Sequence, residues 1–387
     1  MLGIATRLLS RRHLVGCFVF ACVWITLALH EVLPQYHVEH ERSRGRGWRD
    51  HPSFLVGDCP YYRATLLSVM RDGDLDIKNN FQVRQYQASS NVALGTRGEW
   101  YPKHPVLMPI AAIPFYAVAR DLGLIFFNLA QLSALVTLIW YGAQRYTSTS
   151  VATALAFACA FGTMLRSASY NFAPDVFSTL LVTAGVVASL YEGALLSGVC
   201  LGLAVWAKWT NCVFLPLPIV FFSVRFDARS AILYSLGAGV PVLMLLYLNY
   251  HMFGSAFITP YDRVLVRVNG RGPLVLEPSH RTFFTQPFWD GLWDQLTDRE
   301  MGLFVACPVA VLVPLGALLL LRSAPSEAVL LVGACAVQLA IFAKYDQWRE
   351  SSYGPRFLLT VVALSGILAA PVVQRVFAGT GVGRPSK

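Results

Sequence analysis

Charged residues are scarce in this chain. Asp, Glu, Lys and Arg make up only 14% of its 387 residues, whereas about 25% is usual for a soluble globular protein. Hydrophobic residues make up 55% of the chain and are concentrated in long runs. The composition therefore excludes an ordinary soluble domain and predicts a polytopic integral membrane protein.

Paired cysteines and metal-ligand spacings are missing as well. Seven of the eight cysteines lie in apolar segments and only Cys59 lies in a polar loop, so neither a disulfide framework nor a zinc site is indicated. His37 and His40 are spaced like metal ligands, but a solvated loop is the simpler interpretation because no helix holds a third ligand nearby. We predict no metal site and no cofactor, with a divalent cation left open.

The sequence also lacks a nucleic-acid signature. The formal net charge is +9, but the arginines lie mostly in loops and no RNA- or DNA-binding motif is present. We therefore expect no nucleic acid among the partners and count membrane lipids among them instead.

Ten apolar runs can be assigned to membrane spans, each of which needs about 20 apolar residues. The first covers 14–34 and follows Arg7, Arg11 and Arg12, which place the N-terminus in the cytoplasm. The short apolar stretch 105–119 is interpreted as an interfacial helix. The other predicted spans are 122–143, 149–166, 175–191, 194–208, 212–224, 231–251, 302–321, 328–344 and 358–376.

This layout predicts an all-α chain with juxtamembrane helices in its first extracytoplasmic loop. Both termini lie in the cytoplasm, and the long loops 35–104 and 252–301 lie outside; the excess of Lys and Arg in the cytoplasmic segments agrees with this orientation. Residues 1–377 form a single membrane domain, and 378–387 form a disordered cytoplasmic tail. In a bacterium the protein would be a multi-pass protein of the plasma (inner) membrane.

The first long loop holds the most informative motif, Gly57-Asp58-Cys59-Pro60-Tyr61-Tyr62. A short helix is predicted over Tyr61 to Met70 from its partial helical periodicity. Other polar motifs flank the predicted spans on the same side of the membrane. They are Arg71-Asp72-Gly73-Asp74-Leu75-Asp76, Trp100-Tyr101-Pro102-Lys103-His104-Pro105, Tyr170-Asn171-Phe172-Ala173-Pro174-Asp175, Gly202-Leu203-Ala204-Val205-Trp206-Ala207-Lys208 and Ser352-Tyr353-Gly354-Pro355-Arg356-Phe357.

In their order and sidedness these motifs resemble the GT-C membrane glycosyltransferases, in the broad group of protein mannosyltransferases and lipid A aminoarabinose transferases. The resemblance is greatest to bacterial members with a Gly-Asp-Glu-Pro-His-Tyr signature and extends over residues 14–376. Two positions depart from that signature, because Cys59 stands where Glu is usual and Tyr61 where His is usual.

The resemblance implies transfer of a sugar from a polyprenyl phosphate to a lipid, glycan or protein acceptor. Such a reaction needs a base for the acceptor's proton and cations for the departing phosphate. Asp58 is the candidate base. Because it lies just before Pro60 it is equally suited to cap a helix N-terminus, and both roles can hold at once.

Lys208 and Arg356 are the candidate ligands of the donor phosphate. A cation at the outer end of an apolar helix, as Lys208 is, normally has a functional partner, although it can also extend to the lipid headgroups. Arg356 follows a rigid Gly-Pro turn that suits a guanidinium held against a phosphate; an ordinary interfacial arginine is the alternative.

Further residues are candidates for a supporting role. Asp175 is a possible second carboxylate at the site, a partner for Arg166, or a helix cap. Tyr61, Tyr62, Lys103 and His104 lie in the same motifs, although Lys103 and His104 also suit plain interfacial anchors.

Two other functions stay open at this point. A lipid or solute carrier is disfavoured, because carriers place polar groups near mid-membrane and often have repeated halves. A catalytically inactive GT-C relative is the other alternative, since Cys59 replaces a residue that the family's motif normally provides.

Overall fold

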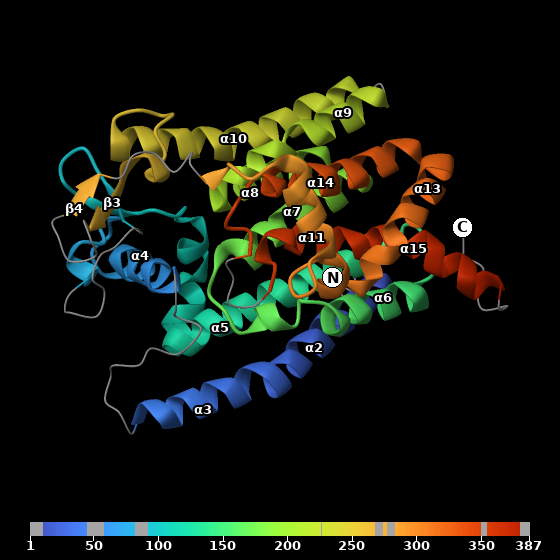
Figure 1. Cartoon of the computed structure of the whole chain (residues 1–387), viewed down its shortest axis with the longest axis horizontal. Coiled ribbons are helices and arrows are strands. Elements are labelled where there is room, and N and C mark those ends of the chain that lie inside the picture. Colours follow the sequence, from blue (N-terminus) through green and yellow to red (C-terminus); the bar gives the residue numbers. More distant parts are fainter. Residues whose placement is uncertain are drawn as a thin grey trace, which may run out of the picture.

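The computed structural model describes residues 11–44, 58–81, 92–225, 227–267, 274–276, 283–349 and 354–379. Arg7, Gly57, Ser352 and Tyr353, and the predicted tail from residue 380 onward, lie outside the described residues. Figure 1 shows long helices running side by side, with the strands and α4 (Cys59–Arg71) gathered at one end of the bundle.

The predicted first span lies in a continuous helical segment. It consists of α2 (Arg11–Leu27), the π-helical turn η1 (Ala28–Val32) and α3 (Leu33–Arg44). Its apolar part, Arg12–Val38, is long enough to cross a membrane. The segment packs against α5 through α2 and is otherwise largely uncovered by protein, as a helix facing lipid would be.

Residues 105–119 and 122–143 form the two parts of α5 (Leu107–Ala143), which is sharply broken at Ala119 and Arg120. Arg120 has a φ of 52°, outside the helical region. The break brings the first part back onto the second, so that a side chain at Gly123 would overlap the carbonyl oxygen of Phe115. The structure thus confirms a separate helix before the span, while its interfacial position stays a prediction.

Helices occur at every other predicted span, but several are short. Five helical segments of the described chain are long and apolar enough to cross a membrane, and five shorter apolar helices accompany them. Ten complete spans are therefore not confirmed, because polar corners and prolines divide some runs. The remaining elements are α6 (Thr149–Gly162), η4 (Ser167–Ser169), α7 (Pro174–Leu190), α8 (Ala194–Ala207), η5 (Trp209–Phe214), α9 (Pro216–Val224), α10 (Ala228–Phe253), α12 (Leu303–Ala306), η9 (Pro308–Leu312), α13 (Val313–Ser323), α14 (Pro325–Ala343), η10 (Arg356–Leu358) and α15 (Leu359–Gly379).

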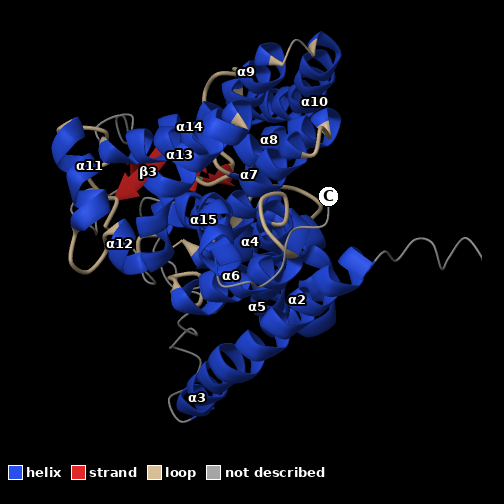
Figure 2. Cartoon of the chain, turned by 90° about the vertical axis from the view of Figure 1, so that its right-hand side faces the viewer, coloured by secondary structure: helices blue, strands red, loops and turns tan. Residues whose placement is uncertain are grey.

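The core lies around α15, whose side chains up to Gln374 are almost all buried between α5, α6, α7, α13 and α14 (Figure 2). By contrast, α10 exposes a continuous row of large apolar side chains, including Ile232, Leu236, Val240 and Leu243. Such a surface is unusual on a soluble monomer. It is the surface expected of a helix that faces lipid.

The prediction of an all-α chain was incomplete, because the structure also contains a small antiparallel sheet. Its strands are β1 (Val92–Leu94), β2 (Trp100–Pro102), β3 (Val264–Arg267) and β4 (Leu274–Leu276), in the order β2-β1-β3-β4. Each strand has only three or four residues, too short for a clear alternating pattern. Because β1 pairs with β3, the loops 35–104 and 252–301 meet at the same end of the molecule, as the predicted topology requires.

The short helices η3 (Asn79–Phe81) and η6 (Pro260–Arg263) complete this end of the molecule, whereas α11 (Phe288–Thr297) packs against α14 and α12. The predicted helix over Tyr61 to Met70 is confirmed as α4 and begins with Pro60 in its first turn. An ion pair of 2.6 Å between Arg63 and Asp121 ties α4 to the broken helix α5. The sheet and α4 together therefore position the residues of the first motif above the helix bundle.

Candidate active site

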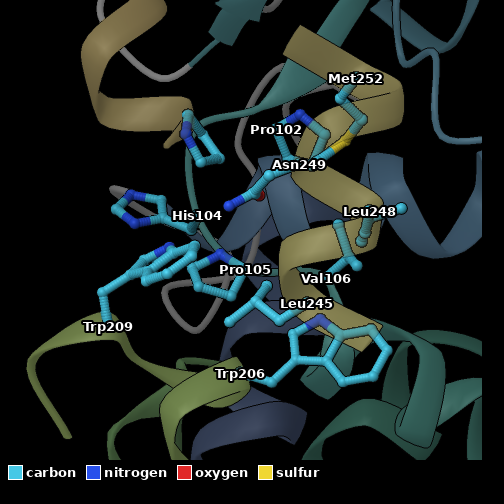
Figure 3. Close-up of a pocket in the computed structure, with 11 residues that line it drawn as sticks. Pro102, His104, Pro105, Val106, Trp206, Trp209, Leu245, Leu248, Asn249 and Met252 are labelled. Carbon is cyan, nitrogen blue, oxygen red and sulfur yellow. The ribbon is translucent and has the colours of Figure 1, made fainter. Parts of the chain in front are cut away.

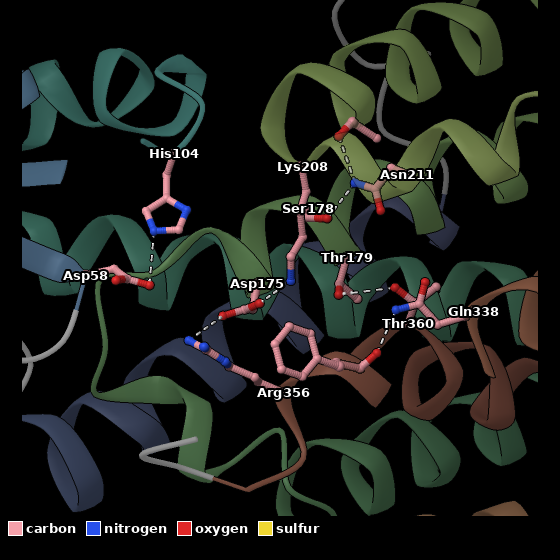
Figure 4. A network of polar contacts seen from close by, with 12 residues as sticks. Asp58, His104, Asp175, Ser178, Thr179, Lys208, Asn211, Gln338, Arg356 and Thr360 are labelled. Carbon is pink, nitrogen blue, oxygen red and sulfur yellow. Dashed lines mark hydrogen bonds and ion pairs between the residues drawn. The ribbon is translucent and has the colours of Figure 1, made fainter. Parts of the chain in front are cut away.

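Asp58 lies immediately before α4, but its side chain does not cap the helix. Its main-chain carbonyl accepts hydrogen bonds from the N–H groups of Tyr61 and Tyr62. The carboxylate instead faces His104, with 3.2 Å between Oδ2 of Asp58 and Nε2 of His104 (Figure 4). This contact has the distance of an ion pair, although the alignment is not that of a hydrogen bond.

His104 joins three segments of the chain at one point. Its Nδ1 lies 2.9 Å from the hydroxyl of Tyr261, which belongs to the second long loop. Its ring also packs against Tyr62 of α4, with 5.5 Å between the ring centroids. His104 is therefore held between a carboxylate and a phenol, in a fixed orientation beside Asp58.

The surroundings keep Asp58 ionised. Burial opposes its charge, but the charge of His104, followed by those of Arg356 and Lys103, outweighs this effect and holds the pKa of Asp58 well below its ordinary value. The carboxylate is thus an oriented acceptor for a proton or a hydroxyl at neutral pH, and a weak base in the thermodynamic sense.

Lys208 and Asp175 form a buried ion pair, with 2.6 Å between Nζ and Oδ1. Only 3% of the Asp175 side chain is exposed. Asp175 lies in the first turn of α7, and Lys208 occupies the extended residue between α8 and η5. Asn211 stabilises this corner by donating hydrogen bonds of 2.7 Å to the main chain of Ala204 and to the hydroxyl of Ser178.

Arg356 approaches the same carboxylate from the last polar corner of the chain. Its NH1 lies 3.9 Å from Oδ2 of Asp175, and its guanidinium lies 4.9 Å from the ring centroid of Phe357. Gly354, with a φ of 106°, supplies a main-chain turn that favours glycine. Gln338 of α14 donates a 2.6 Å hydrogen bond to the carbonyl of Phe357, which holds the corner in place.

The structure thus brings together most of the residues that the sequence singled out (Figure 4). The charge of Arg356 acts on both Asp58 and Asp175, which links the two ion pairs into one cluster. Lys103 lies 5.8 Å from the ring centroid of Tyr261 and adds a further positive charge. Lys103, Lys208 and Arg356 thus place three permanent cations in the cluster, where they suit an anionic ligand.

Three other residues considered from the sequence, Tyr61, Tyr62 and Arg166, make contacts outside the ion pairs of this cluster. Tyr62 is fully buried against His104 and Phe172, where burial raises the pKa of its hydroxyl well above the ordinary value. Tyr61 packs in a separate cluster with Ile77 and Trp100 beneath the sheet. Arg166, considered as a partner of Asp175, forms a 2.6 Å hydrogen bond to Glu31.

Cys59 is buried beside the cluster, where its Sγ donates to Oδ1 of Asn171 at 3.4 Å. Burial, with the charges of Asp58 and Asp175, raises the pKa of the Cys59 thiol to about 12. Among the described residues, no group of three or more His, Cys, Asp or Glu side chains is placed to hold a metal ion. That the protein uses no cofactor stays a prediction.

Sequence reasoning missed Tyr261 and Asn171, which contact His104 and Cys59 respectively. Asn171 lies within a motif that the sequence had singled out. Tyr261 had a local signal in the segment Thr259-Pro260-Tyr261-Asp262, which forms a capping box at the start of η6. That pattern predicts a turn, but nothing in it indicates contact with the first loop.

No family profile matches this chain, and no curated protein matches it. In three dimensions the chain is similar to the apo oligosaccharyltransferase of Archaeoglobus fulgidus, with a TM-score of 0.58 and 12% sequence identity. The similarity covers 94% of this chain and 51% of the archaeal one, so this chain spans about half the length of that protein. The comparison shows that the two proteins share a fold over nearly the whole of this chain.

Proposed function

We propose that this protein is a membrane glycosyltransferase that moves a sugar from a polyprenyl-phosphate donor to an acceptor. Transfer takes place on the extracytoplasmic face, where the two long loops meet, and both termini lie in the cytoplasm. The acceptor is a hydroxyl or amine of a lipid, glycan or protein. The protein is an integral multi-pass membrane protein. No cofactor is proposed, and a role for a divalent cation is left open.

One observation carries this proposal. Asp58, Asp175, Lys208 and Arg356 come from four segments that are far apart in the sequence, and they lie in one charged cluster at one end of an apolar helix bundle. The cluster also contains a carboxylate, Asp58, whose side chain caps no helix, so helix capping does not explain its position.

We propose one role for each group, and the geometry supports it. Asp58 orients the acceptor hydroxyl and takes its proton as the new bond to the sugar forms. His104 fixes the carboxylate and keeps it ionised. Lys208 and Arg356 stabilise the negative charge that develops on the leaving phosphate, and groups fixed in advance are most effective at this task.

Asp175 has a positioning role, since it holds both cations at 2.6 Å and 3.9 Å. The aromatic rings of Phe342 and Phe357 lie beneath Lys208, with centroids at 5.8 Å and 4.7 Å from its Nζ. These rings exclude water from one side of the ammonium group. A charge in such surroundings interacts more strongly with a phosphate than a solvated one does.

The proposal is tested with purified protein in lipid and a panel of polyprenyl phosphates that each carry a labelled sugar. A membrane extract serves as the source of acceptor. Transfer of label from one of these donors is the expected result. Binding of a donor without transfer would contradict the proposal and favour an inactive GT-C relative, whereas movement of an intact donor or of a solute across the bilayer would favour a carrier.

A further inference from the structure

A pocket adjoins the candidate site on the side of His104 that is formed by α10 and the corner between α8 and η5. It lies between these helices and the segment that enters α5 (Figure 3). The wall is mostly apolar and contains the two indoles of Trp206 and Trp209. The lining residues are Pro102, His104, Pro105, Val106, Trp206, Trp209, Leu245, Leu248, Asn249, Met252 and Pro260.

Several buried polar atoms of this wall have no hydrogen-bond partner within the described part of the chain. They are Nε1 of Trp206, Nε1 of Trp209 and Oδ1 of Asn249. Asn249 is completely buried. Its Nδ2 donates to the carbonyl of Ala256 at 3.2 Å, which fixes the amide orientation and leaves Oδ1 as the unused acceptor.

Unused donors and an unused acceptor in one pocket indicate the chemistry of a ligand. Both indole nitrogens carry a hydrogen and can only donate, whereas Oδ1 of Asn249 can only accept. A phosphate oxygen would leave Asn249 unpaired, and an ammonium group would leave the indoles unpaired. An alcohol hydroxyl both donates and accepts, so it alone among these groups can satisfy both kinds of atom.

The size and charge of the pocket agree with such a group. Its volume of about 10 Å³ is close to the minimum for one water-sized group. Neither Lys208 nor Arg356 lines it, so the cations that suit a phosphate lie outside the pocket. Figure 3 shows the indole of Trp209 beside His104, the pocket residue that also belongs to the candidate site.

We infer that this pocket binds a hydroxyl group of a sugar ring, with the apolar face of the ring packed against the indole of Trp209. The inference rests on the proposed function and adds a sugar-recognition site to it. The hydroxyl belongs either to the donor sugar or to an acceptor glycan, because both offer the same chemistry. In either case the ring lies next to Asp58 through the shared residue His104.

The test compares wild type with Trp209→Phe, which keeps an aromatic face but removes the indole N–H. The probes are polyprenyl phosphates carrying glucose, mannose or arabinose, the same lipid without a sugar, and the matching methyl glycosides. Trp289→Phe is the control, since Trp289 is 74% exposed on α11. The thermal unfolding midpoint is measured for each variant, and Trp206→Phe replaces Trp209→Phe if the latter unfolds.

Loss of one buried hydrogen bond weakens binding by about tenfold. A tenfold rise in Kd for a sugar-bearing lipid, with unchanged affinity for the sugarless lipid, supports the inference and assigns the hydroxyl to the donor. The same rise for a methyl glycoside alone also supports it and assigns the hydroxyl to the acceptor.

Unchanged Kd values for every probe in a folded variant would overturn the inference. Equal wild-type affinity for sugar-bearing and sugarless lipid, together with no glycoside binding, would also overturn it. These outcomes are separate from failure of the proposed function, because the affinities are compared whether or not wild type transfers label.

Discussion

His104 contacts Asp58 through one ring nitrogen and Tyr261 through the other, at 3.2 Å and 2.9 Å. The ring thereby joins the start of α4 to the second long loop at the same place where β1 pairs with β3. The local sheet and the candidate base are thus parts of one arrangement. The fold of the two loops sets the orientation of Asp58 and the charge that surrounds it.

The pH dependence of transfer follows from this contact. Because the folded pKa of Asp58 is lowered, its contribution to stability is present above the unfolded pKa of about 3.9 and is lost as pH falls through the folded value. Burial raises the pKa of Asp58, and the charge of His104 lowers it. Without that charge, the pKa of Asp58 therefore rises. We expect His104→Gln to move the acidic limb of the pH–activity profile to higher pH.

The control for that profile is His251→Gln, at the exposed end of α10. Its acidic limb is expected to coincide with that of wild type. The profile is measured with labelled donor from pH 8 down to the lowest pH at which both proteins stay folded. An unchanged acidic limb in His104→Gln would show that His104 does not set the ionisation of Asp58.

Variants of the ion pair of Lys208 and Asp175 are expected to change the stability of the fold and the transfer activity in different ways. Lys208→Met leaves a buried carboxylate with a poorer partner, and loss of one member of a buried pair costs about 3 kcal/mol. The double variant Lys208→Met with Asp175→Leu removes both charges and is expected to recover most of that stability. Transfer stays low in both variants, because the phosphate has lost a cation.

Unfolding in detergent and transfer of label are measured on the same preparations. A double variant that regains activity together with stability would show that Lys208 has a structural role only. Recovery of stability alone is the result that the phosphate-binding role requires.

Cys59 is expected to be unreactive in the folded protein. With a pKa of about 12, only about one thiol in 10⁴ is ionised at pH 8, and the thiolate is the reactive form. Labelling by a maleimide, followed by mass spectrometry, is expected to modify Cys59 only after denaturation. An Asp290→Cys variant supplies an exposed thiol for comparison; equal labelling rates at the two positions would contradict the buried environment.

Gly123 is predicted to be essential for the break in α5. A methyl group there meets the main chain of Phe115, and overpacking of this kind costs about 1–3 kcal/mol. Gly239 in α10 is the matched control, since a side chain there meets no atom within 4 Å. Gly239→Ala is expected to be neutral or stabilising by up to about 1 kcal/mol, and equal unfolding midpoints for the two variants would contradict the described packing.

Much of the helical architecture could be predicted from hydrophobic runs, because a long apolar run has few alternatives to a helix. The break at Ala119 and Arg120 was also visible, since a short apolar stretch preceded the charged pair Arg120 and Asp121. The number of complete spans could not be predicted, because the length of an apolar run does not show where it is divided. The run 302–321, for example, forms the three elements α12, η9 and α13.

The charged residues of the candidate site could be predicted from the sequence, but the contacts between its residues could not. Tyr61 and Tyr62 are adjacent in the motif, yet neighbouring residues of a helix point about 100° apart, so only Tyr62 faces His104. The sheet escaped prediction because its strands are three or four residues long and pair across distant loops. For the same reason the contact of Tyr261 with His104 had no signal in the sequence.

The role of Asp58 as the base is the central claim. Asp58→Asn keeps the shape of the side chain and removes the negative charge, and loss of a general base typically lowers the rate about 10²–10⁴-fold. Asp290→Asn is the matched control, because Asp290 is an exposed carboxylate on α11. Asp58→Asn is expected to lower the unfolding midpoint, because the charges that lower the pKa of Asp58 also stabilise the folded protein. Asp290→Asn is expected to keep the wild-type midpoint, so rates are compared where both variants are folded.

The measurement is the initial rate of transfer of labelled sugar from the best polyprenyl-phosphate donor, for wild type and both variants in lipid. We expect the rate to fall by at least about a hundredfold in Asp58→Asn and to be unchanged in Asp290→Asn. A rate for Asp58→Asn equal to that of wild type would contradict the assignment of Asp58 as the base.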